Sequence, residues 1–285
     1  MLARRLTFLR VVEVLPPLYD ASGGRAKRLD TGAAMERFGE EARAIRDFAD
    51  IILVANVKDL KRVKFDSVHA AVILQEDYNL NAAPVIVVRD QNRPQFLSTV
   101  LTAISLGVNS MMIAWGDDYP ESSHVSNVRD FADLAGAIRE ASRIRSRARS
   151  PARLFAPVDL ESLVYPKGVA LARERLRAGA DFLLAQPPTT DDGETFDWHD
   201  SLLEKSGLKE RVLPNVFHFK DDADIRHYER MFGWMLPRGL HQAAKGEGGL
   251  AELETRVVRR LRVTGYAGVY LSTRGNPSVA ERVLA

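Results

Sequence analysis

Short, almost uniformly apolar runs recur along the chain, and longer stretches of mixed apolar and polar positions separate them. Most of the short runs are apolar at every position, which is typical of parallel strands covered on both faces. The pattern predicts eight strands: Phe8–Val14, Ile51–Ala55, Val85–Val88, Ser110–Ala114, Arg153–Phe155, Phe182–Ala185, Val212–Phe217 and Ala267–Leu271.

The stretches between these runs place apolar residues at helical spacing. The clearest are Ala33–Phe48, Gln95–Leu106, Val128–Arg143, Gly168–Ala178 and Leu250–Val263. Eight strands that alternate with helices over 285 residues favour the α/β class, and a closed (β/α)8 TIM barrel over an open doubly wound sheet. The first strand is not followed by G-x-G-x-x-G, the signature of a Rossmann dinucleotide site. We predict a single barrel domain over residues 1–285.

Composition narrows the class of protein. The chain has no Cys, which excludes disulfides, thiolate metal sites and cysteine nucleophiles. Its 40 basic and 38 acidic residues leave a net charge of +2, so no global field attracts nucleic acid. No segment reaches the roughly 18 apolar residues of a membrane span, and the N-terminus lacks the pattern of a signal peptide. We expect a cytoplasmic protein that binds neither nucleic acid nor membrane.

Chemistry in such barrels collects where the strands end. Glu13 lies among apolar neighbours, so burial would raise its pKa and make it a candidate general acid; the alternative is a structural ion pair. Gly116 and Asp117 follow the fourth strand, where a glycine permits close approach to a ligand, although Gly-Asp is also a common turn. Gln186 ends the sixth strand, and its amide suits either the edge of a heterocycle or loop backbone.

The segment after the third strand offers both caps and a cation. Asp90 or Asn92 is placed to cap the following helix, with Pro94 in its first turn. Arg89 is a candidate for binding an anionic group. The six histidines show no H-x-x-x-H or H-E-x-x-H spacing, so the sequence predicts no metal site.

Three blocks of sequence together carry a family resemblance. The first strand runs into Glu13–Pro17, a central strand ends in Gly116-Asp117, and the segment Ala178–Phe182, which begins Ala-Gly-Ala-Asp, leads into the strand that ends in Gln186. In this order and spacing the chain resembles the methylenetetrahydrofolate reductase family, from about Val12 to its end. The resemblance implies a (β/α)8 barrel that acts in one-carbon metabolism.

The resemblance also implies a reaction and roles for named residues. In the family, a reduced flavin passes hydride to the bridging carbon of 5,10-methylenetetrahydrofolate and produces 5-methyltetrahydrofolate, with NAD(P)H as the hydride source. Glu13 matches the acid that helps to open the bridged ring to an iminium cation. Asp117, Gln186 and Tyr270 match residues that contact the substrate.

The chain departs from the family where the flavin is anchored. Four positions that carry polar or charged anchors in the family are replaced: Val85, Trp115, Ala156 and Gly168. A Lys of the family is replaced by Arg175, which still suits a phosphate. Two hydride routes remain open. Either FAD binds in an altered way, at a site that includes Trp115, Gly116 and Arg175, or a reduced nicotinamide gives hydride directly without flavin.

Two interpretations from other classes also remain open. The barrel could be a folate-binding protein or a partner subunit without reductase activity, but a mere binder gains little from a buried Glu13. It could instead be an unrelated barrel lyase or aldolase, although lysines such as Lys58 and Lys167 fall outside the predicted strands. We expect a reduced folate or related pterin as ligand, and leave open a homo-oligomer or an electron-donating partner subunit.

Overall fold

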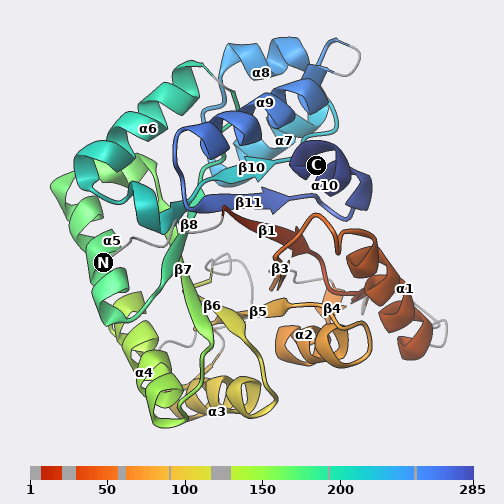
Figure 1. Cartoon of the computed structure of the whole chain (residues 1–285), viewed down its shortest axis with the longest axis vertical. Coiled ribbons are helices and arrows are strands. Elements are labelled where there is room, and N and C mark those ends of the chain that lie inside the picture. Colours follow the sequence, from red (N-terminus) through yellow and green to blue (C-terminus); the bar gives the residue numbers. More distant parts are fainter. Residues whose placement is uncertain are drawn as a thin grey trace.

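The computed structural model describes residues 8–20, 30–56, 62–89, 91–116, 130–191, 193–246 and 249–285. Parallel strands form a nearly closed barrel surrounded by helices (Figure 1). The strands, in the order in which they adjoin, are β10 (Asn215–Phe217), β11 (Gly268–Ser272), β1 (Leu9–Val14), β3 (Ile51–Val54), β5 (Ala82–Val87), β6 (Ser110–Ala114), β7 (Arg153–Asp159), β8 (Phe182–Gln186) and β9 (Val212–Leu213). The predicted (β/α)8 barrel is confirmed, and each of the eight predicted runs contains barrel strand.

Pro214 divides one of the eight barrel strands into β9 and β10. β9 pairs with β8 and β10 pairs with β11, so the two short pieces together occupy the last place in the ring. Proline has no N–H to give to a ladder, but the Pro214 carbonyl still accepts a hydrogen bond from the Tyr270 N–H at 2.9 Å. The interruption therefore leaves Asn215 in register with Tyr270.

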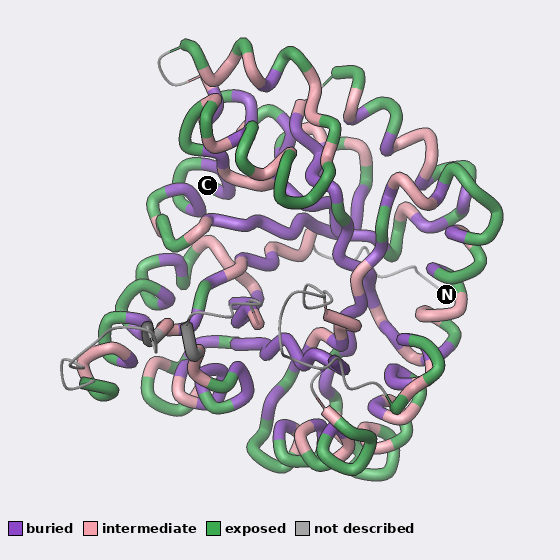
Figure 2. The backbone as a smooth tube through the Cα atoms, turned by 180° about the vertical axis from the view of Figure 1, so that it is seen from behind, coloured by how far each residue is buried: buried purple, intermediate pink, exposed green. Residues whose placement is uncertain are grey.

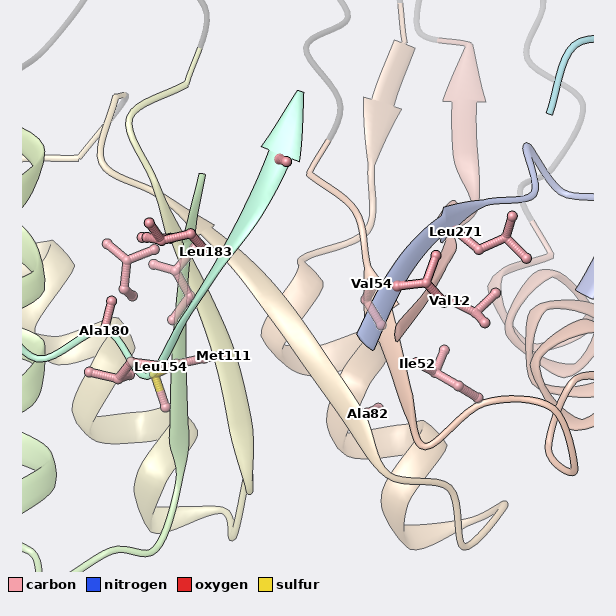
Figure 3. Close-up of a cluster of buried hydrophobic side chains, with 14 of the residues drawn as sticks. Val12, Ile52, Val54, Ala82, Met111, Leu154, Ala180, Leu183 and Leu271 are labelled. Carbon is pink, nitrogen blue, oxygen red and sulfur yellow. The ribbon is translucent and has the colours of Figure 1, made fainter. Parts of the chain in front are cut away.

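Alternate residues of each strand enter two different cores. In β1, Val11 belongs to the cluster that fills the barrel, whereas Val12 belongs to the layer beneath the helices. Figure 3 shows this outer layer, with Val12 among the labelled residues. Leu184 of β8 belongs to the inner cluster. Because strand side chains alternate between faces, Glu13 and Gln186 take the inward positions at the carboxyl ends of their strands.

Helices cover the outside of the barrel, and in Figure 2 their exposed faces point away from the buried strands. They are α1 (Thr31–Ala44), α2 (Ser67–Glu76), α3 (Arg93–Ser105), α4 (Leu134–Arg147), α5 (Pro166–Ala178), α6 (Glu194–Ser206), α9 (Gly249–Val263) and α10 (Pro277–Leu284). Each of the five predicted helical stretches overlaps one of them. Among the residues that the structure describes, no helix is both long enough and apolar enough to cross a membrane.

Side-chain caps fix where four of these helices begin, α3 and α4 among them. Asn92 Oδ1 accepts a hydrogen bond from the Gln95 N–H at 2.9 Å, which confirms the predicted cap of α3. Asp133 Oδ1 accepts from the Gly136 N–H at 2.7 Å, so α4 begins at Leu134, several residues after the predicted start. A cap satisfies an N–H at the helix end that has no partner within the helix.

An insert lies between β10 and β11, before the barrel helix α9. It consists of α7 (Asp222–Phe232) and α8 (Arg238–Ala243), and it contributes to a small apolar cluster of its own. His241 joins the two helices, because its Nδ1 lies 2.6 Å from Asp222 Oδ1 and its Nε2 lies 3.3 Å from Glu229 Oε1. The insert begins after β10, which pairs with β11, and it leads into α9.

The remaining elements are short. β2 (Leu18–Asp20) and β4 (Arg62–Lys64) form an antiparallel pair outside the barrel sheet. Two single-turn 3-10 helices, η1 (Glu161–Val164) and η2 (Lys209–Arg211), lie in the connections after β7 and before β9. They do not change the order of the barrel strands.

Candidate functional site

Polar residues collect at inward positions near the carboxyl ends of neighbouring strands. β8, the β9–β10 strand, β11 and β1 adjoin in the barrel. They contribute Gln186, Asn215, Ser272 and Glu13, and Tyr270 lies two residues before Ser272 on β11. The fold thus brings three of the residues singled out from the sequence, Glu13, Gln186 and Tyr270, to one side of the barrel mouth.

Glu13 is held by β11. Its Oε2 accepts a hydrogen bond from the Tyr270 hydroxyl, and its carboxyl group also bonds the Ser272 hydroxyl. Burial raises the pKa of the Glu13 carboxyl above its usual value, while the bonds from Tyr270 and Ser272 act in the opposite direction. The result is a carboxyl group that retains its proton to higher pH than an exposed glutamate, as the sequence predicts for a general acid.

Tyr270 acts as a neutral hydrogen-bond donor to this acid. Its side chain is only 4% exposed and belongs to the apolar cluster inside the barrel. Burial raises the pKa of the Tyr270 hydroxyl well above its usual value, and the nearby Glu13 charge raises it further. The phenol therefore keeps its proton and holds the Glu13 carboxyl in one orientation.

The insert and the end of β11 place an aromatic and charged group beside Glu13. Arg274 pairs with Asp224 of α7, and its guanidinium carbon lies 4.6 Å from the centre of the Tyr228 ring. Burial is the main cause of the raised pKa of Tyr228, and the Glu13 charge contributes to it. Arg274 lies two residues after Ser272, which is opposite Glu13, so its pairing with Asp224 holds α7 near the acid.

Gln186 is the last residue of β8, and its side chain is exposed. Its backbone carbonyl accepts a hydrogen bond from the Leu160 N–H at 2.7 Å, and the peptide bond to Pro187 is cis. The hydrogen bond from Leu160 holds the Gln186 backbone at the strand end, while its side chain remains exposed. This arrangement suits a residue that contacts a ligand, which is the role that the resemblance implies.

The end of β6 is packed tightly. Gly116 has φ +86°, and a Cβ there would lie 2.3 Å from Val87 Cγ1, so packing alone requires a glycine. Trp115 packs against the outer core beneath the helices. Arg89 is only 1% exposed, and a Cβ at Gly116 would lie 3.2 Å from its Cβ. Asp117, the other predicted residue of this segment, lies outside the described residues.

Arg175 lies on α5, on the outer side of the barrel. Its Nη1 donates a hydrogen bond to the Pro157 carbonyl at 2.5 Å, and burial lowers the pKa of its guanidinium, against the opposing effect of Asp159. Together with Trp115 in the outer layer and Gly116 against Val87, this leaves the three residues engaged by the scaffold. An altered FAD site built on these three residues would need them to face the ligand instead.

The sequence prediction missed Asn215 and Ser272. Asn215 is a polar residue inside the predicted apolar run Val212–Phe217, a signal visible in the sequence. Ser272 follows the predicted run Ala267–Leu271 at once, and only the register of β11 against β1 shows that it lies opposite Glu13. In the described ranges, no cluster of three or more His, Asp or Glu side chains is arranged to hold a metal ion.

Comparison with known proteins defines the class by fold. No protein-family model and no curated protein matches the sequence. An uncharacterized protein from Clostridium thermocellum that binds two copies of 5-methyl-5,6,7,8-tetrahydrofolic acid is similar in structure, with a TM-score of 0.62 and 12% identity over 97% of this chain and 95% of that chain.

Two enzymes have the same architecture. 2,3-dimethylmalate lyase, a member of the PEP mutase/isocitrate lyase superfamily, matches with a TM-score of 0.55 and 15% identity, over 98% of this chain and 81% of its own. Oxaloacetate acetylhydrolase matches with a TM-score of 0.56 and 15% identity, over 96% of this chain and 78% of its own. At such identities the likeness establishes a (β/α)8 barrel.

Proposed function

We propose that this chain binds a reduced folate or related pterin at the carboxyl mouth of its barrel and reduces 5,10-methylenetetrahydrofolate to 5-methyltetrahydrofolate. The observation that carries the proposal is the Glu13 carboxyl, an acid with a raised pKa that is bonded to Tyr270 at the mouth. Gln186 lies at the end of β8 on the same side, with an accessible amide. The family resemblance supports the same assignment of these residues.

The proposed chemistry needs an acid at this place. Opening the bridged ring breaks the bond between the methylene carbon and one nitrogen, which takes up a proton as it leaves. Glu13 supplies that proton, and the carboxylate that remains is stabilised by the hydroxyls of Tyr270 and Ser272. The methylene carbon is then an iminium cation that accepts hydride. General acid catalysis typically contributes about 10²–10⁴-fold to the rate.

The hydride source follows from the poor fit of a flavin site. In the family, bound FAD supplies the hydride, but the Arg175 guanidinium is engaged by the Pro157 carbonyl and Trp115 packs in the outer core. We therefore favour a reduced nicotinamide, NAD(P)H, that gives hydride directly, with an electron-donating partner subunit as the other source. Neither source changes the part played by Glu13.

The structural neighbours support two ligand classes. The Clostridium thermocellum protein that binds 5-methyltetrahydrofolate supports a folate as a ligand for this architecture. The lyase and the acetylhydrolase favour a second candidate, an enzyme that acts on a small carboxylate such as a malate or oxaloacetate derivative. Binding of one ligand class and not the other decides between them.

Calorimetric titration tests the ligand. Wild-type protein is titrated with 5-methyltetrahydrofolate and with oxaloacetate, beside Gln186→Ala and the control Gln95→Ala, which removes an exposed amide on α3. We expect folate binding that weakens about tenfold in Gln186→Ala, the loss of about one hydrogen bond, and is unchanged in Gln95→Ala. Absence of folate binding, or equal affinity in both variants, contradicts the assignment.

Single-turnover reduction tests the acid. Methylenetetrahydrofolate is mixed with protein and NADPH, and the rate is compared between wild type and Glu13→Gln. The variant keeps the shape of the side chain but has no proton to give, so we expect folate binding with a rate about 10²–10⁴-fold lower. A fully active variant removes the catalytic role of Glu13. Wild-type protein that binds folate but never turns over is a binding protein instead.

A further inference from the structure

Asn215 is a polar residue in a place that an apolar one would fill. It lies on β10, is only 1% exposed, and adjoins Val216 of the outer core. Its amide Nδ2 donates a hydrogen bond to Ser272 Oγ at 3.3 Å, while its Oδ1 has no hydrogen-bond partner in the described part of the chain. Burying an amide oxygen without a hydrogen bond destabilises the folded protein, so the presence of Asn215 at this position calls for a role.

Ser272 connects this amide to Glu13. It lies directly opposite Glu13 in the register of β11 against β1, is 2% exposed, and its hydroxyl bonds the Glu13 carboxyl group. A serine hydroxyl has one proton to donate and two lone pairs that accept. Because Asn215 Nδ2 donates to that oxygen, the hydroxyl proton is left to point to another acceptor, and the Glu13 carboxylate is the acceptor at hand.

We propose that Asn215 is a positioning residue that orients the Ser272 hydroxyl toward Glu13 and so sets how readily Glu13 releases its proton. The catalytic meaning of this role rests on the proposed function. A buried carboxyl group without donors holds its proton too tightly to act as an acid near neutral pH. Two oriented donors, Tyr270 and Ser272, stabilise the carboxylate and make the proton transferable.

The other groups around Glu13 do not replace this control. Across β3 its register partner is the apolar Leu53. From α7 the nearby titratable group is Tyr228, and the adjacent Arg274 is paired with Asp224. The hydrogen bonds that lower the pKa of Glu13 come from Tyr270 and Ser272. Of these two donors, Ser272 is the one whose hydroxyl accepts a hydrogen bond from the Asn215 side chain.

The test measures the Glu13 carboxyl pKa directly, in protein without folate. Carbon-13 NMR of glutamate-labelled protein follows the titration, and Glu13→Gln identifies the resonance. Ser272→Ala should raise the pKa by about one, a tenfold change in proton affinity. Asn215→Leu should also raise it, and the double variant should equal Ser272→Ala alone, because Asn215 acts through the serine. If Asn215→Leu does not fold, Asn215→Ala takes its place.

The control is Thr190→Val. The Thr190 hydroxyl is also buried, but unlike the Ser272 hydroxyl it has no hydrogen-bond partner in the described residues. This variant should leave the Glu13 pKa unchanged. An Asn215 variant with a wild-type Glu13 pKa, or an additive double variant, overturns the proposal. Failure of folate binding or turnover, with the pKa coupling intact, contradicts the proposed function and not this positioning role.

Discussion

Acidification from pH 7 to pH 4 should destabilise the protein through one buried histidine. His199 of α6 is 2% exposed, and its Nδ1 lies 3.0 Å from Thr189 Oγ1. Burial lowers the pKa of the His199 ring from 6.5 to about 4, although the nearby charge of Asp191 opposes the change. The folded protein therefore keeps the ring neutral where the unfolded chain already binds a proton.

The magnitude follows from linkage between protonation and folding. The pKa of the His199 ring is 6.5 in the unfolded chain and about 4 in the folded protein. Its contribution to the free energy of unfolding is therefore full only above pH 6.5, and it is lost as the pH falls toward 4. At about 1.4 kcal/mol for each tenfold change in proton affinity, the loss at pH 4 is about 3 kcal/mol. For a chain of this size that corresponds to a fall in Tm of roughly 6–12 °C.

Urea denaturation at a series of pH values measures the effect. Wild type is compared with His199→Asn, in which an uncharged amide can still meet Thr189, and with His69→Asn, which replaces an exposed histidine on α2. Between pH 7 and pH 4 the free energy of unfolding of wild type should fall by about 3 kcal/mol more than that of His199→Asn. His69→Asn should follow wild type. Parallel curves for wild type and His199→Asn would refute the reasoning.

Three further predictions follow from the site. The folded pKa of Glu13 lies above the unfolded value of 4.5, so wild type should lose stability as the pH rises from about 4.5 through that raised pKa. Glu13→Gln should not lose this stability. Equal pH slopes of the two proteins in urea denaturation contradict the prediction. Gly116→Ala should lower the free energy of unfolding by about 2–4 kcal/mol, since the new Cβ meets Val87 at a positive φ, whereas Gly265→Ala, with nothing within 4 Å, should cost only about 1 kcal/mol. The purified protein should show no visible absorbance of bound flavin, and a tightly retained FAD would contradict the poor fit of Arg175 and Trp115.

The strands were predictable because the barrel buries them on both faces. Apolar runs such as Phe182–Ala185 match the observed strand within one residue. Helix α2 was missed for the same reason, since Ser67–Glu76 buries six of its ten residues and lacks the polar face that marks an amphipathic helix. Burial makes a helix and a strand alike in the sequence when neither has a solvent face.

The site was predictable only where one residue stands out from its own strand. Glu13 interrupts an apolar run and Gln186 ends one, and both were found on that ground. The contact between Asn215 and Ser272 joins residues 57 positions apart, and it depends on register, which local sequence does not encode. The positions of Trp115 and Arg175 depend on which face of the barrel each side chain meets, so residue type alone was not informative.

The insert formed by α7 and α8 is separate in the sequence from the strands that hold Glu13 and its hydrogen-bond donors. The insert begins after β10 and leads into α9, which precedes β11. Because β10 and β11 pair directly with each other, the lengths and sequences of α7 and α8 can change without shifting the register of Asn215 and Tyr270. The strands keep the acid and its donors, whereas the insert brings Tyr228 and Asp224 to the rim. An engineer could exchange this module for another and alter the rim of the barrel while Glu13 and its hydrogen-bond donors stay in place.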